Sequence, residues 1–152
     1  MTYINNENRV RFLVESLKND EKGYFLTVNA LTNNRQQFES QLLKLSLWLN
    51  DYCYGRKALK RDKRLTIFGG IEIGELRGKL HAHLIIKNDI DIKRSIYEIN
   101  FEIRKLWAKA TKAKGSIFNS LVDFQKTQNI KQSAEYALKK VRTNQNDTLL
   151  YI

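Results

Sequence analysis

Two adjoining stretches of this chain alternate apolar and polar residues, and they constrain the fold more than any other feature of the sequence. The first runs from Leu65 to Ile73, with apolar residues at odd numbers, and the second from Gly78 to Ile86, with apolar residues at even numbers. Successive side chains of a strand point to opposite faces, so each stretch predicts a strand with one apolar face. Glycines bound the connection Gly74–Gly78, which favours a β-hairpin.

The polar face of the second strand carries the only two histidines of the chain, His81 and His83. Two imidazoles that leave the same face of a strand can bind one metal ion. The apolar faces of both strands must cover the same core, and a turn centred between Leu76 and Arg77 satisfies this condition. That register sets Glu72 opposite His81. The sequence therefore predicts His81, His83 and Glu72 as metal ligands, the alternative being solvated or hydrogen-bonded polar residues of a sheet face.

Composition limits the class of protein. The 152 residues suit one domain over residues 1–152, because no proline or linker marks a boundary. The net charge of +11 predicts an anionic partner, most often nucleic acid. A single cysteine, Cys53, excludes an internal disulfide and suits a reducing cytoplasm. The N-terminus does not resemble a signal peptide and no window approaches the ~18 apolar residues of a spanning helix, so we expect a cytoplasmic protein without a membrane partner.

The rest of the chain predicts further strands and helices around the hairpin. Their order is strand, helix, hairpin, helix, strand, helix, which suits an α+β domain with a mostly antiparallel sheet and helices packed on one face. The sequence predicts no clear secondary structure for residues 1–20, apart from a short helix over Val10–Leu17. The other predicted elements are a strand over 24–32, a helix from about Phe38 to 51–55, a helix from Asp91 to Gly115, a strand over 117–124 and a helix over 129–142.

The last predicted helix places one tyrosine away from the core. Its apolar residues, Ile130, Ala134, Ala137, Leu138 and Val141, form one stripe. At about 100° per residue, Tyr136 lies roughly 140° from the centre of that stripe. Lys139 and Lys140 follow three and four residues later, within reach on the helix surface. A tyrosine on the polar side of a helix, beside lysines, is a candidate functional side chain.

Three motifs of this chain resemble those of the HUH endonuclease superfamily, which is named for two histidines that flank a hydrophobic residue. His81-Ala82-His83 fits that motif, and Tyr136-Ala137-Leu138-Lys139 is similar to the Tyr-x-x-Lys motif of its single-tyrosine replication initiators. Tyr24-Phe25-Leu26-Thr27 resembles their first motif, a strand that ends in Leu-Thr. The motif order also matches, and the resemblance spans residues 24 to 140. Leu80 stands where many members carry a proline.

The resemblance implies an HUH nuclease domain of the Rep-like, ferredoxin-like or RRM-like type. It implies a metal-dependent endonuclease and strand transferase that nicks single-stranded DNA at a replication origin, through a covalent 5′-phosphotyrosine, to start rolling-circle replication. Tyr136 would be the nucleophile, and Lys139 and Lys140 would stabilise the phenolate or the phosphate. The three predicted ligands would hold Mn²⁺ or Mg²⁺, and imidazole ligands favour Mn²⁺.

A basic stretch is the second sign of a nucleic-acid partner. Residues 56–64 carry six basic side chains and one acidic one. We expect the basic residues to contact DNA phosphates, a solvated loop being the alternative; they are Arg56, Lys57, Lys60, Arg61, Lys63 and Arg64. Trp107 is expected in the core rather than against DNA. Thr27 and Asn29 are expected at most to support the metal ligands.

The resemblance names single-stranded DNA, at an origin or in a hairpin, as the partner, and it leaves a host helicase and a homodimer open. A single-tyrosine transposase or a relaxase would use the same chemistry for another task. A zinc hydrolase could use the same three ligands, but it would leave Tyr136 and the basic surface without a role. The alternative of another class is a non-catalytic basic nucleic-acid-binding module with structural histidines, which would bind DNA without cutting it.

Overall fold

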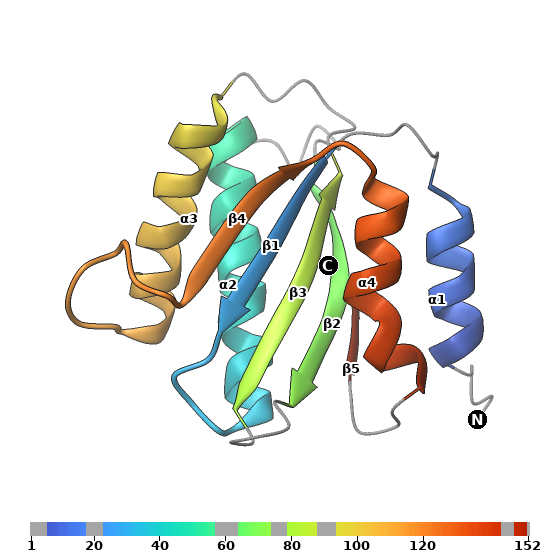
Figure 1. The fold of residues 1–152 in the computed structure, drawn as a ribbon. Coiled ribbons are helices and arrows are strands. Elements are labelled where there is room, and N and C mark those ends of the chain that lie inside the picture. Colours follow the sequence, from blue (N-terminus) through green and yellow to red (C-terminus); the bar gives the residue numbers. More distant parts are fainter. Residues whose placement is uncertain are drawn as a thin grey trace.

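The computed structural model describes residues 6–17, 23–56, 64–73, 79–87, 94–143 and 148–151. Its strands form one sheet in the order β4-β1-β3-β2-β5, and each pair of neighbours is antiparallel (Figure 1). This arrangement confirms the α+β class. The strand that carries the histidines, β3, lies at the centre of the sheet. The strands are β1 (Gly23–Asn29), β2 (Thr66–Ile73), β3 (Leu80–Lys87), β4 (Val122–Thr127) and β5 (Thr148–Tyr151).

Four helices accompany the sheet in the described ranges: α1 (Asn6–Glu15), α2 (Arg35–Tyr54), α3 (Ile96–Thr111) and α4 (Ile130–Thr143). The segment β1-α2-β2-β3-α3-β4 has the strand order 4-1-3-2 of the ferredoxin-like split β-α-β topology. Helix α1 overlaps the short helix predicted over Val10–Leu17, whereas β5 was not predicted. No helix in these ranges is long and apolar enough to cross a membrane.

Helices cover both faces of the sheet, so the prediction that they pack on one face is wrong. On one face, Phe38 of α2 and Trp107 of α3 pack against Leu26 and Leu84, within the larger of two apolar clusters. Trp107 is therefore a core residue, as predicted.

On the opposite face, α4 and α1 pack over Phe68 and Ile85 through Ile130, Leu138 and Val10. The second layer exists because Phe68 and Ile85 point to the histidine face, where their large apolar side chains must be removed from water.

The second helix layer covers only part of the histidine face. Helix α4 lies over β2 and β3 and meets the start of β1 at Gly23, and α1 packs against α4, whereas the rest of β1 and the front of β4 are left open by the described helices (Figure 1). The side chains on this open part are polar and partly or fully exposed; examples are Thr27, Asn29, Asp123 and Gln125. The histidines therefore lie at the border between a helix-covered area and an open polar area of the sheet.

The helix predicted from Asp91 to Gly115 is shorter at both ends. It spans Ile96–Thr111 and begins with a capping box, in which the Ser95 hydroxyl accepts from the Glu98 amide and the Glu98 carboxylate accepts from the Ser95 amide. It ends at Lys112, which adopts a left-handed conformation with φ of 56°. The apolar stripe was correctly located, but the local capping pattern decided the ends.

The strand predicted over Ile117–Phe124 is found at Val122–Thr127 instead. Residues 117–121 form a turn because Arg104 of α3 donates hydrogen bonds to the carbonyls of Ile117 and Asn119, at 3.4 and 3.0 Å. These two bonds hold the backbone of residues 117–119 against α3. The shift moves the start of β4 to the pairing partner of Val28.

Candidate metal centre

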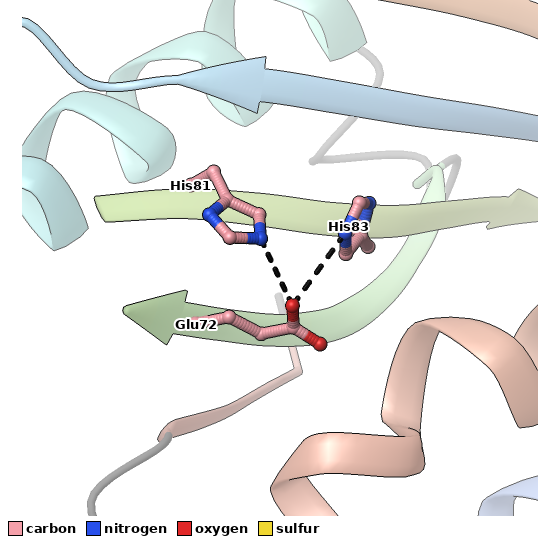
Figure 2. Close-up of side chains that lie close together, drawn as sticks. All are labelled: Glu72, His81 and His83. Atoms are coloured by element: carbon pink, nitrogen blue, oxygen red, sulfur yellow. Dashed lines mark hydrogen bonds and ion pairs between the residues drawn. The ribbon is translucent and has the colours of Figure 1, made fainter. Parts of the chain in front are cut away.

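The β2–β3 register brings Glu72, His81 and His83 together. Glu72 pairs directly with His81 and Gly70 pairs with His83, which confirms the predicted register. Glu72 Oε2 lies 2.9 Å from His81 Nε2 and 3.6 Å from His83 Nε2, and both rings turn towards this one oxygen (Figure 2). One ligand atom from each residue lies within 4.8 Å of the others, so the three residues could hold one metal ion.

The backbones of β2 and β3 approach each other closely beside the centre. A Cβ atom added at Gly69 would overlap the backbone carbonyl of His83. Only glycine leaves room for β3 at this position, and the absence of a side chain brings the backbones of β2 and β3 together beneath the centre.

The chemistry of the three groups fits a divalent cation. The Glu72 side chain is only 5% exposed, and a buried carboxylate is stable only when it is paired or bound to a metal. Two imidazoles and one carboxylate are ligands that divalent transition metals accept, and three protein ligands leave coordination positions open. The distance between His81 and Glu72 also suits a hydrogen bond in the absence of metal. Measuring the stability of the protein with and without metal distinguishes a metal centre from such a hydrogen-bonded pair.

Thr27 orients one of the histidines. It pairs with His83 across β1 and β3, and its Oγ1 lies 3.0 Å from His83 Nδ1. In the tautomer with the proton on Nδ1, the ring donates to Thr27 and Nε2 keeps its lone pair for a metal. Thr27 is therefore placed to orient His83, and its expected role in supporting a metal ligand stays a prediction. Asn29 does not fill this role, because its side-chain amide donates to the carbonyl of Ser120.

Replacing Thr27 by valine should weaken Mn²⁺ binding by about 10- to 100-fold, the usual loss when a residue that orients a ligand is removed. Valine keeps the branched shape of threonine but cannot accept from His83. Thr27→Ser keeps the hydroxyl and should retain affinity within a few-fold of wild type. Isothermal titration with Mn²⁺ measures both variants, and equal affinities for Thr27→Val and wild type would contradict the orienting role.

Two aromatic side chains border the centre. The ring of His83 lies 5.7 Å from the ring of Phe25, which it stacks against, and 5.7 Å from the ring of Tyr136, which it meets edge to face. Tyr136 is 64% exposed on α4, so it lies off the core, as its helical position predicted. The structure thus places the predicted tyrosine beside the predicted histidines. The sequence did not indicate a role for Phe25, which reads as an ordinary strand residue.

No protein-family model matches this chain, and no curated protein or solved structure matches it. The ferredoxin-like topology does not specify an activity either, because one topology supports many functions. The function therefore has to be inferred from the chemistry of the centre and of its surroundings.

The structure describes some of the predicted lysines and arginines, and the others lie outside its described residues. Lys139 is exposed on α4, one turn after Tyr136, and lines a groove of about 750 Å³ between α1 and α4 together with Arg11 and Lys131. Lys140 lies in α4, but its side chain is outside the described part. Of the basic stretch, Arg56 and Arg64 are described and exposed. Lys57, Lys60, Arg61 and Lys63 lie outside the described residues.

A cleft of about 490 Å³ lies on the other side of Tyr136, between β4 and the start of α4. Phe25 and Tyr136 supply its aromatic walls. Its remaining walls are polar and include the amide side chains of Gln125, Gln128, Asn129 and Gln132. Aromatic rings and amides are the groups that stack on and hydrogen-bond to unpaired bases, so the cleft suits a nucleotide next to Tyr136.

Cys53 is not a candidate nucleophile. Burial raises the pKa of its thiol to about 11. The thiol is therefore protonated at neutral pH, whereas nucleophilic and metal-binding cysteines act as thiolates.

Proposed function

We propose that this protein is a metal-dependent single-stranded DNA endonuclease and strand transferase with Tyr136 as its nucleophile. The observation that carries the proposal is the contact between the Tyr136 and His83 rings, 5.7 Å apart, at the edge of the three-ligand centre. The ring of Tyr136 packs against His83 and Phe25, but this 64% exposed side chain does not need its hydroxyl for that packing. The three motifs in HUH order and the net charge of +11 support the same function.

The open polar half of the histidine face receives the single strand in this proposal. The cleft beside Tyr136 accepts a base, and the phosphate that follows the base lies over Glu72, His81 and His83. Exposed cations, among them Arg56, contact other phosphates of the strand. A duplex is a poorer substrate, because its bases are paired and cannot enter the cleft.

Cleavage is an exchange of phosphate esters. A divalent cation, Mn²⁺ or Mg²⁺, held by Glu72, His81 and His83 would polarise the scissile phosphate and stabilise the charge of the transition state. The Tyr136 oxygen attacks phosphorus, its proton passes to water, and the bond from phosphorus to the 3′ oxygen breaks. The 3′ oxygen takes up a proton and leaves as a hydroxyl. Because a free phenol has a pKa of about 10, the ammonium of Lys139 assists by stabilising the phenolate.

A covalent tyrosine ester explains why the nucleophile is not water. The 5′-phosphotyrosine keeps the energy of the phosphodiester, so a 3′-hydroxyl can later attack it and rejoin the strand. The released 3′-hydroxyl can meanwhile prime synthesis. We therefore propose that the protein nicks the replication origin of a small plasmid or virus to start rolling-circle replication in the host cytoplasm.

A denaturing gel tests the proposal. A pool of labelled single-stranded DNA is incubated with the purified protein, with Mn²⁺ or with a chelator. We expect cleavage only with metal, and a product whose 5′ end remains attached to the protein. Binding of the pool without cleavage of any sequence would instead support a non-catalytic module with structural histidines.

A further inference from the structure

The outer side of the α2–α3 layer, which points away from the sheet, carries exposed aromatic side chains. Tyr97 and Phe101 lie one turn apart on α3 and are 82% and 46% exposed, and Phe118, in the loop that leads into β4, is 66% exposed. The rings of Phe101 and Phe118 lie 6.2 Å apart. Adjoining exposed aromatic residues are unfavourable in water, and such patches mark interaction sites.

Cationic side chains lie over the aromatic residues of this layer. A cation within about 6 Å of a ring centroid is attracted to the face of the ring, so these cations are held on the same layer as the aromatic residues. In the described part of the chain the pairs are Arg94 over Tyr52 at 4.3 Å, Lys109 over Trp48 at 4.3 Å, Lys105 over Phe101 at 5.7 Å and Arg104 over Phe118 at 5.8 Å.

The charge of this surface selects the kind of partner. Two acidic residues of α3 lie among the cations: Glu98 is 3.7 Å from Arg94, and Glu102 is 3.6 Å from Lys105. Cations remain in excess, since α3 and its C-terminal end also carry the exposed Lys109, Lys112 and Lys114. A second copy of the chain would bring two positive surfaces together, which is unfavourable. Exposed rings among cations instead match the way proteins hold single strands, by base stacking and phosphate contacts.

We propose that this outer side of the α2–α3 layer is a second binding surface for single-stranded DNA, with Tyr97, Phe101 and Phe118 stacking on bases and Arg94, Lys105 and Lys109 contacting phosphates. The inference rests on the proposed preference for single strands and not on cleavage. The surface lies on the opposite side of the sheet from Tyr136, and β4 forms the sheet edge between them (Figure 1). A strand that occupies the metal centre reaches this surface by passing over that edge, next to Phe118.

Strand length tests the inference. Fluorescence anisotropy is measured with single strands of about 8 and about 30 nucleotides, because comparable single-strand sites cover ~4–16 nucleotides. The double variant Tyr97→Ala/Phe118→Ala should bind the long strand at least ~10-fold more weakly than wild type, since each stacked base contributes roughly that factor. Its affinity for the short strand should change less than about two-fold, because a strand of this length is too short to span both surfaces and the site at the metal centre is proposed as the tighter of the two.

Phe12→Ala is the matched control, because Phe12 is an aromatic residue that is 73% exposed on α1, outside this surface. It should bind both strands as wild type does. Unchanged affinity of the double variant for the long strand would overturn the inference, and so would an equal loss for both lengths. A wild-type dimer in sedimentation that the double variant dissociates, with DNA affinity unchanged, would assign the surface to a second copy. Failure of the wild type to cleave would contradict the proposed function but would not alter the comparison of strand lengths.

Discussion

Tyr136→Phe should reduce covalent cleavage of single-stranded DNA by at least ~10³-fold, the scale of loss when an enzyme's nucleophile is removed. The change deletes one oxygen and keeps the ring, so the contacts with the rings of His83 and Phe25 remain. The side chain is 64% exposed on α4, and its hydroxyl is not needed to fill the core. Binding of DNA and Mn²⁺ should therefore be retained while the protein-linked product disappears from the denaturing gel.

Tyr54→Phe is the matched control, since it makes the same chemical change at a half-buried position near the end of α2. It should cleave as wild type does. Metal-dependent cleavage by Tyr136→Phe at the wild-type rate would remove Tyr136 from the reaction. If that product also lacked attached protein, the nucleophile would be water, and the centre would be that of a hydrolase.

The sequence predicted the parts of this centre that depend on local periodicity. In a hairpin, a slip of one residue would move every apolar side chain of a strand to the wrong face, so the pattern limited the register, and a turn centred between Leu76 and Arg77 then paired Glu72 with His81. In the last helix, the apolar stripe defined the buried side and left Tyr136 on the other. Neither pattern could place Tyr136 next to His83, because that contact depends on how α4 docks on the sheet.

Contacts between distant segments accounted for what the sequence did not reveal. Thr27 meets His83 only because β1 pairs with β3, 56 residues further along the chain. The layer formed by α1 and α4 depends on Phe68 and Ile85, whose positions on the polar face looked like isolated exceptions to the alternation. Strand β5 is four residues long and has no pattern of its own, so only its pairing with β2 defines it.

Glu72→Gln should weaken Mn²⁺ binding by more than ~100-fold, a larger loss than that for a residue which only orients a ligand. Glutamine has the shape of glutamate but no charge, and an amide oxygen is a weaker ligand than a carboxylate. Mn²⁺ at about 100 times the wild-type Kd should stabilise wild type against unfolding by ~2.7 kcal/mol, because only the folded state assembles the site. The same concentration should leave the melting temperature of Glu72→Gln almost unchanged.

The stability of the metal-free proteins separates a metal centre from a structural network. Glu72 holds a carboxylate that is 5% exposed, so glutamine removes the cost of burying that charge and can still accept from His81. If the three residues serve to bind metal, metal-free Glu72→Gln should be at least as stable as metal-free wild type. The control Glu39→Gln, on α2, should respond to Mn²⁺ as wild type does. The opposite result has two parts: Glu72→Gln is less stable than wild type without metal, and Mn²⁺ does not stabilise wild type. Together they would show that the triad is structural, because the fold would then require the ion pair and not the cation.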